Sequence, residues 1–202
     1  LALSAKFSLL EDNVLLAQTG YLTIKAVRGT TVTLGYPNRE VSVSMARLYA
    51  EAILDKNAIN RAGEGYLADY LEDGNLSAFV EEVNRIVLGI DYQAFPLSSE
   101  ASCRAAVFIM VSSSSTLITA RCEAHNAHGR SDLEIQTNKN YWVLEFKYCR
   151  KGASPEALLQ EAVRQIKARQ YGSQLPQSNL IRAALVFSQK GRKFTHWAEV
   201  WD

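Results

Sequence analysis

The chain lacks most of the features that assign a protein to a class at a glance. Its 202 residues contain only three cysteines, an odd number without the spacing of a disulfide scaffold, which favours a reduced, cytoplasmic protein. No apolar run is long enough to span a bilayer, so we predict no membrane partner, and no secretory signal opens the chain. The sequence has no G-x-x-x-x-G-K-[ST] motif, which excludes a P-loop ATP site within it.

The chain lacks an excess of either sign of charge, because its formal net charge is only +1. The two halves differ, however. Residues 1–100 hold 8 Lys and Arg against 13 Asp and Glu, a net charge of −5, whereas residues 101–202 hold 14 against 8, a net charge of +6. A basic half is what a phosphate-binding surface needs, although this excess is small and gives only mild support.

The most informative stretch runs from Gly129 to Lys147. Two apolar, β-prone runs flank the polar residues Thr137–Asn140, which predicts a β-hairpin with its turn centred between residues 138 and 139. With that centre, Asp132 lies directly opposite Glu145, and Lys147 shares their face of the sheet. The other face is predicted to be core, formed by Leu133, Ile135, Trp142 and Leu144.

The second strand of this hairpin contains charges where none is expected. From Tyr141 to Tyr148 it is apolar except for Glu145 and Lys147, which is typical of a strand buried on both faces. Buried charged groups are costly unless they are paired or bind a metal. Two interpretations therefore stay open, a structural ion pair of Lys147 with Glu145 or Asp132, and a divalent-cation site with a lysine beside it.

Asp132 followed by Glu145-Phe146-Lys147, with the lead-in Gly129-Arg130-x-Asp, resembles the Asp…Glu-x-Lys core of the PD-(D/E)xK nuclease superfamily. The three-residue core is common by chance, but its combination with Gln165-Ile166 and Tyr171 is more specific. Two upstream segments extend the resemblance over nearly the whole chain. Residues 18–25 (QTGYLTIK) and 34–41 (LGYPNREV) resemble predicted AAA-ATPase-like bacterial proteins that carry such a domain at their C-terminus.

We expect an α/β chain in two parts, divided near Asp73-Gly74-Asn75. Residues 1–74 are predicted to form a small helix-plus-hairpin, winged-helix-like domain, the C-terminal part of an AAA-ATPase-like region. Residues 75–202 are predicted to form the nuclease-like domain. From Glu100 onward, helix 100–111, strand 116–122, the central hairpin, helix 155–169 and strands 180–187 and 194–201 follow one another. This gives the αβββαβ order expected of the restriction-endonuclease-like fold, preceded by helices at 6–18, 41–54, 63–71 and 76–88 and strands at 21–27 and 31–36.

The resemblance implies roles for several residues. Asp132, Glu145 and the backbone carbonyl of Phe146 would bind Mg²⁺ or Mn²⁺, because these ions prefer oxygen ligands. Lys147 would orient a water molecule or stabilise charge that builds on the phosphate. Glu100 is implied as a further metal ligand at the start of its helix, although it also suits the helix dipole as an ordinary N-terminal carboxylate.

A second set of residues is implied as contacts to the substrate. Gln165 would point back towards the site, although a solvated glutamine is the alternative. Tyr171 is six residues further on, so a joint role requires the helix to end between the two. The candidates for nucleic-acid binding are Arg130, Arg150, Lys151, Arg164, Lys167 and Tyr171.

One competing metal site must be weighed. Cys122-x-x-His125-x-x-His128 has a spacing that suits zinc, but the sequence contains no second Cys/His pair, and we favour a polar loop between strands. Glu123 in the same stretch is the alternative to Glu100 as an extra acidic ligand.

The resemblance implies Mg²⁺-dependent hydrolysis of phosphodiester bonds in DNA. One alternative is a non-catalytic module that binds nucleic acid or a protein partner and regulates an upstream ATPase, and another is a structural domain for oligomerisation. The intact set of Asp132, Glu145 and Lys147 favours catalysis, since a module without chemistry has no need for all three. Because the first residue is Leu, we expect a fragment or a processed product, with the ATPase domain before residue 1.

Overall fold

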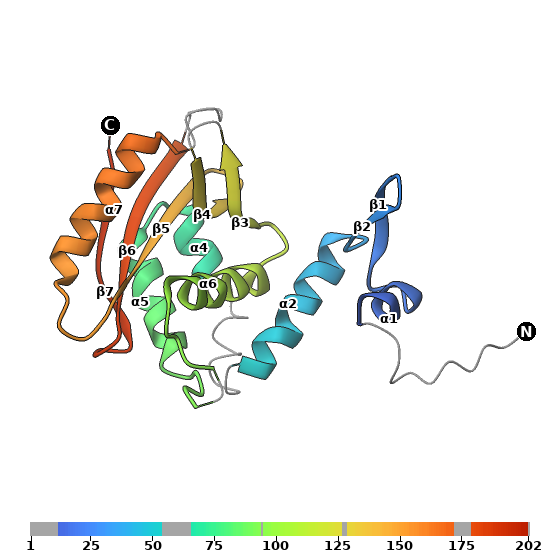
Figure 1. The fold of residues 1–202 in the computed structure, drawn as a ribbon, viewed down its shortest axis with the longest axis horizontal. Helices are drawn as coiled ribbons and strands as arrows, with labels where there is room; N and C mark the ends of the chain where they lie inside the picture. Colours follow the sequence, from blue (N-terminus) through green and yellow to red (C-terminus); the bar gives the residue numbers. More distant parts are fainter. Residues whose placement is uncertain (1–11, 54–65, 94, 127–128, 172–178, 202) are drawn as a thin grey trace, which may run out of the picture. The chain divides into compact units, whose positions relative to one another are not determined.

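Figure 1 shows the computed structural model, which describes residues 12–53, 66–93, 95–126, 129–171 and 179–201. Within these ranges the side chains of residues 12, 13, 49, 51–53, 123–126, 129 and 130 are not described. Contacts along the chain divide it into two compact units, residues 1–45 and 46–202.

The first unit contains α1 (Asp12–Gln18) and an antiparallel hairpin of β1 (Thr23–Arg28) and β2 (Thr31–Gly35). Gly29 occupies the turn with a φ of +59°, a conformation that glycine adopts without steric cost. Helix α2 (Arg39–Ile53) follows and crosses the boundary between the units. The predicted order of helix, hairpin and helix is therefore present, whereas the likeness to a winged helix stays a prediction.

The second unit is built on a five-stranded mixed sheet with the strand order β3-β4-β5-β6-β7. β5 and β6 run parallel, and the other neighbouring pairs run antiparallel. The strands are β3 (Thr119–Asn126), β4 (Gly129–Gln136), β5 (Tyr141–Cys149), β6 (Leu180–Ser188) and β7 (Lys193–Glu199). The helices are α4 (Tyr66–Glu72), α5 (Leu76–Val87), α6 (Glu100–Ser114) and α7 (Pro155–Arg169).

The order from α6 to β6 is the αβββαβ order predicted from the sequence. Together with the mixed sheet, it is consistent with a restriction-endonuclease-like fold. The local signals explain the helix starts. Ser154 accepts a hydrogen bond from the backbone N–H of Ala157, and Pro155 opens α7 at the position where its missing N–H costs nothing. In the part of the chain that is described, no helix combines the length and apolarity needed to cross a bilayer.

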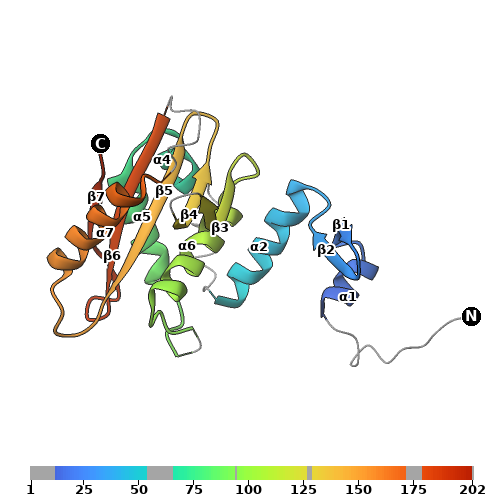
Figure 2. The same ribbon diagram turned by 45° about the horizontal axis from the view of Figure 1, so that its top comes forward.

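The sheet is covered on both faces (Figures 1 and 2). Helix α7 packs on one face, where Ala162 and Ile166 meet Val143 of β5. Helices α4, α5 and α6 cover the other face and form the larger core with Trp142 and Leu144. β5 is therefore buried on both sides, which is why its sequence is an almost continuous apolar run.

The C-terminal end of α4 is attached to the turn and start of β5. Asn140 donates from its side-chain amide to the carbonyl of Leu71 at 2.9 Å, and the indole of Trp142 donates to the same carbonyl at 2.9 Å. These bonds satisfy a carbonyl in the last turn of the helix, which also accepts from the backbone N–H of Gly74 at 3.4 Å. We predicted a boundary near Gly74, but the compact units meet between residues 45 and 46, and α4 shares the core of the sheet. Where the functional domains divide stays a prediction.

Side-chain hydrogen bonds join α5 to the edge strand β7, and Asn84 makes two of them. Asn84 accepts from the backbone N–H of Phe194 at 2.8 Å and donates to its carbonyl at 2.8 Å. Replacing it in Asn84→Ala should lower the free energy of unfolding by about 1–3 kcal/mol, because both backbone groups then have no partner. Urea unfolding measures the change. The exposed Glu81→Ala on the same helix is the control and should stay within about 0.5 kcal/mol of wild type. Equal midpoints and slopes for the two variants would contradict the role of Asn84.

Candidate active site

The register of the β4–β5 hairpin places the candidate site. Leu133 pairs with Leu144 and Ile135 with Trp142, as predicted, and all four side chains are fully buried. The ladder then ends, one pair before Asp132 and Glu145. The prediction that Asp132 pairs directly with Glu145 in the β4–β5 ladder is therefore wrong.

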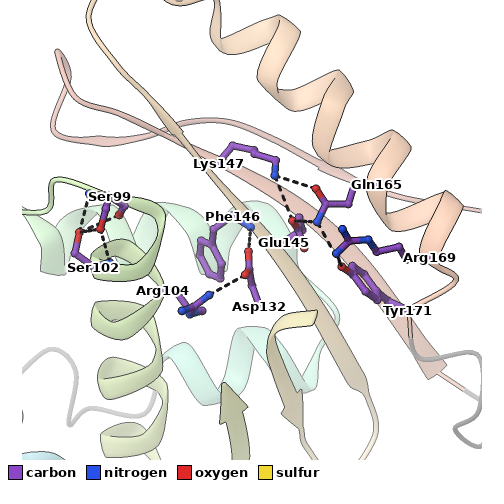
Figure 3. Close-up of polar contacts among 10 residues, drawn as sticks. All are labelled: Ser99, Ser102, Arg104, Asp132, Glu145, Phe146, Lys147, Gln165, Arg169 and Tyr171. Carbon is purple, nitrogen blue, oxygen red and sulfur yellow. Dashed lines mark hydrogen bonds and ion pairs between the residues drawn. The ribbon is translucent and has the colours of Figure 1, made fainter. Parts of the chain in front are cut away.

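The carboxylate of Asp132 explains why the ladder ends there. Its Oδ2 accepts the backbone N–H of Phe146 at 2.9 Å, so that a side chain takes a β5 donor in place of a backbone carbonyl of β4. Its Oδ1 accepts from Arg104 of α6 at 2.8 Å, and both side chains of this ion pair are mostly buried. Figure 3 shows Asp132 beside β5, between the strand and Arg104.

Glu145 is the most buried charged group of the site, with 2% of its surface exposed. Its Oε1 accepts from Lys147 at 3.4 Å and from the amide of Gln165. Its Oε2 is buried and has no hydrogen-bond partner among the described residues. A buried carboxylate oxygen without a donor is costly, and native structures rarely keep one without a function.

Two effects raise the pKa of Glu145 to about 7. Burial is the larger, because a low-polarity environment disfavours the charged carboxylate. The negative charge of Asp132 is the second, and the neighbouring ammonium of Lys147 opposes both effects. Asp132 is thus close enough to disfavour the charge of Glu145, a condition that a bound cation would relieve.

Lys147 is 8% exposed and lies among three oxygen acceptors. Its ammonium nitrogen is 3.0 Å from Oε1 of Gln165, 3.4 Å from Oε1 of Glu145 and 3.6 Å from Oε1 of Glu161. Burial lowers the pKa of Lys147, but the neighbouring carboxylates of Glu145, Glu100 and Glu161 outweigh it, and the pKa is raised. The lysine is therefore held as a cation beside Glu145.

Gln165 connects these charges to α7, as the sequence predicted when it placed this side chain towards the site. It accepts from Lys147 through its oxygen and donates through its nitrogen to Glu145 and, at 3.4 Å, to the hydroxyl of Tyr171. The helix ends at Arg169, and Gln170 adopts the left-handed conformation with a φ of 45°. This reversal returns the fully buried Tyr171 to the site, the condition required for the two residues to act together.

The other predicted residues lie further out. Glu100 opens α6 with an exposed side chain, near enough to influence Lys147, while Ser99 caps the helix. Arg150, Lys151, Arg164 and Lys167 are exposed. The side chains of residues 123–130 lie outside the described part of the chain, which includes Glu123, His125, His128 and Arg130. Among the residues that are described, no three His, Cys, Asp or Glu side chains gather closely enough to hold a metal, so Glu100 does not complete a three-carboxylate group.

Three residues of the site were not predicted from the sequence. Arg104 lies one helical turn after Glu100, and Glu161 lies one turn before Gln165, so helical spacing from a predicted site residue is the signal that points to both. Arg169 donates to the hydroxyl of Tyr171 at 2.8 Å. Its charge also acts on Glu145 and lowers the pKa of that carboxyl slightly against the larger effect of burial.

The donor set suits a hard divalent cation. Two carboxylates lie beside the same short segment of β5, and one of their four oxygens is buried without a donor. Mg²⁺ is commonly held in proteins by one or two carboxylates, with the remaining positions filled by water and phosphate oxygens. The residues present therefore fit such an ion through Asp132 and Glu145.

Comparison with protein families gives a match for the second unit. A family model described as the PD-(D/E)XK nuclease superfamily matches residues 98–197. The matched region begins two residues before α6 and ends within β7, so it contains the whole of the sheet's αβββαβ arrangement and every residue of the candidate site. A search of curated proteins found no match.

The raised pKa of Glu145 has a measurable effect on stability. Its stabilising effect is fully present below about pH 4.5, the pKa of an unperturbed glutamate, and is lost as the pH rises through about 7. In the presence of EDTA, wild type should therefore lose on the order of 1–3 kcal/mol relative to Glu145→Gln between pH 4.5 and 8. Urea unfolding across this range measures the difference. The control Glu81→Gln should follow wild type, and parallel curves for wild type and Glu145→Gln would contradict the assignment.

Proposed function

Residues 98–197 form a domain of the PD-(D/E)XK nuclease superfamily, and from this premise we propose that the protein is a Mg²⁺-dependent nuclease that hydrolyses phosphodiester bonds in DNA. The observation that carries the proposal is the buried, unpartnered Oε2 of Glu145 beside a second carboxylate and a buried ammonium group. A structural ion pair alone would not require an oxygen left without a donor in the interior.

The residues that would hold the ion are Asp132 and Glu145, with the backbone carbonyl of Phe146 next to Glu145 on β5. A bound Mg²⁺ or Mn²⁺ supplies Lewis-acid polarisation of the scissile phosphate and lowers the pKa of a coordinated water. Arg104 and the N–H of Phe146 fix the Asp132 carboxylate, so that its orientation is set before any ligand arrives.

Lys147 supports the proposed reaction by its fixed position and charge. Gln165 and Glu145 hold the ammonium group on the α7 side of β5, and burial excludes much of the water that would screen it. A cation prepared in this way stabilises negative charge that develops on the phosphate without reorganising during the reaction. Gln165 is a positioning residue in this scheme, because it contacts both Lys147 and Glu145.

The proposal that the ion is Mg²⁺ rests on the superfamily. The proposal that the substrate is DNA rests on the superfamily and on the basic half of the chain. The exposed cations Arg150 and Lys151 come directly after β5, and Arg164 and Lys167 lie on α7. All four are proposed to contact the phosphate backbone. Tyr171 is fully buried, so its proposed contact with nucleic acid is the least favoured of the set. An ATPase domain upstream of residue 1 stays a prediction from the resemblance.

One observation favours a second candidate, a module that binds nucleic acid or a protein partner without cleaving it. Arg104 already neutralises Asp132 at 2.8 Å, and the other oxygen of that carboxylate is bonded to a backbone N–H. A cation would have to share this carboxylate with the guanidinium. Metal binding therefore separates the two candidates.

The first test measures Mn²⁺ binding by calorimetry and cleavage of plasmid DNA on the same variants. Asp132→Asn and Glu145→Gln should each weaken Mn²⁺ binding and abolish cleavage, because each removes a negative charge from the ion's ligands. Lys147→Ala should keep or tighten Mn²⁺ binding, since it removes a competing cation, and should still lower the cleavage rate by about 100-fold or more.

Glu81→Gln, on the exposed face of α5, is the matched control and should retain both Mn²⁺ binding and cleavage. The ion-pair interpretation predicts another pattern, in which wild type fails to bind millimolar Mn²⁺ and both Glu145→Gln and Lys147→Ala melt at lower temperature. That pattern would reject the proposed function.

The second test concerns the nucleic-acid surface. The triple replacement of Arg150, Arg164 and Lys167 by Ala should reduce the salt dependence of duplex DNA binding, by about one unit of slope for each phosphate that the variant no longer neutralises. Fluorescence anisotropy at several salt concentrations gives the slope. Lys139→Ala, an exposed lysine in the β4–β5 turn, removes one charge elsewhere and should leave the slope unchanged. An unchanged slope in the triple variant would exclude this surface as the DNA-binding surface.

A further inference from the structure

A cavity of about 550 Å³ lies at the carboxyl ends of the parallel strands β5 and β6, apart from the carboxylates of the candidate site. Three segments line it: the chain just before α6, the end of β5 with the residues after it, and the turn between β6 and β7. It adjoins the candidate site along the chain, because Tyr148 directly follows Lys147, and Ser98 precedes Glu100 by two residues. Its charged and aromatic lining consists of Tyr92, Tyr148, Lys151, Phe187, Lys190 and Arg192.

The charge of the lining is positive. Among the described residues that line the cavity, three are cations and none is acidic, whereas Asp91 lines a smaller cavity that shares Tyr92 and Arg192 with it. Lys151 and Lys190 are exposed, and neither forms an ion pair with another described residue. Two lysines that have no anionic partner among the described residues lie beside one cavity, which favours a ligand with negative charge.

Two contacts with Tyr92 restrain the side chain and the backbone of Arg192. Its guanidinium lies 4.9 Å from the ring centroid of Tyr92, and its backbone carbonyl accepts from the hydroxyl of the same tyrosine at 3.2 Å. Arg192 also has a φ of 49°, which is uncommon for a residue other than glycine, and such conformations persist where surrounding contacts hold them. Tyr92 and Arg192 therefore form a preorganised wall of the cavity.

Another part of the lining is an aromatic stack. Tyr148 lies nearly parallel to Phe187, with ring centroids 6.0 Å apart and an angle of 12° between the planes. Phe187 is held in turn by Phe194, edge on at 5.2 Å, so the stack is anchored in the core. Tyr148 is half-buried and lines the cavity, where a planar ligand can stack against the same group of rings.

From the aromatic stack and the unpaired lysines together, we infer that this cavity binds one unpaired nucleotide of a nucleic-acid strand. The base stacks against Tyr148, and the phosphate lies against Lys151 and Lys190. Because a base within a duplex does not present its face, the substrate must carry a single-stranded end or another unpaired nucleotide. The inference rests on the proposed function for the kind of ligand, and it defines the substrate more narrowly than duplex DNA.

The test uses the full chain in EDTA, so that binding is measured without cleavage. A fluorescein-labelled five-nucleotide DNA strand is titrated at low salt and followed by anisotropy. Tyr148→Leu should weaken binding by about fivefold or more, since stacking on an aromatic side chain is worth that much or more per base. Tyr148→Phe keeps the ring and should bind like wild type. Lys190→Ala should weaken binding by about threefold, whereas Lys193→Ala, an exposed lysine of the same hairpin outside the lining, should not.

Competing ligands define the occupant. A duplex with a five-nucleotide overhang should displace the probe at about fivefold lower concentration than the same duplex with blunt ends. Free thymidine monophosphate that competes as well as the five-nucleotide strand would overturn the assignment to a strand. Wild-type affinity in both Tyr148→Leu and Lys190→Ala would overturn the site altogether. If these two variants keep wild-type affinity and wild type cleaves DNA with Mn²⁺, the cavity is rejected and the proposed function stands. If the two variants bind the strand more weakly but wild type cleaves no DNA, the proposed function is rejected and the cavity stands.

Discussion

The second unit is organised around a carboxylate in the interior of a sheet. Glu145 lies on the central strand β5, buried to 2% exposure, and one of its oxygens has no donor among the described residues. Such a group can persist only where the rest of the fold contributes enough stability to offset the cost of burying it. The apolar strand, the two covering layers of helices and the ammonium of Lys147 supply that stability. The oxygen that still has no donor, Oε2 of Glu145, is the feature that most strongly suggests a ligand.

The two sides of the candidate site are supported by different layers. Lys147 and Gln165 depend on α7, which packs on one face of the sheet through Ala162 and Ile166. Asp132 depends on α6 of the opposite layer, through Arg104. The geometry of the site therefore depends on the packing of both layers, and we expect a change in either layer to alter the distance between the carboxylates of Asp132 and Glu145.

Much of the fold and part of the site could be predicted from the sequence. The alternation of apolar residues predicted the turn-proximal register correctly, because Leu133 and Ile135 cannot change face without exposing the core. The position of Asp132 could not be predicted in this way, since its side chain competes with the backbone for the N–H of Phe146, and no periodicity encodes that competition. Arg104 was missed because its spacing of four residues from Glu100 is the only signal for it, and that spacing does not indicate a partner 28 residues away. The winged-helix likeness and the catalytic roles stay predictions.

The parallel connection from β5 through α7 to β6 has a consequence for how this protein can change in evolution. Glu145, Lys147, Gln165 and Tyr171 all lie within this one β-α-β element, residues 141–188, so one contiguous stretch of sequence fixes their mutual arrangement. Substitutions in α4, α5 or the first unit can accumulate without displacing one of these four residues against another. Asp132 is outside this element and is held by α6, so a change in the packing of that helix is the simplest route by which a descendant keeps the fold and loses the proposed cation site.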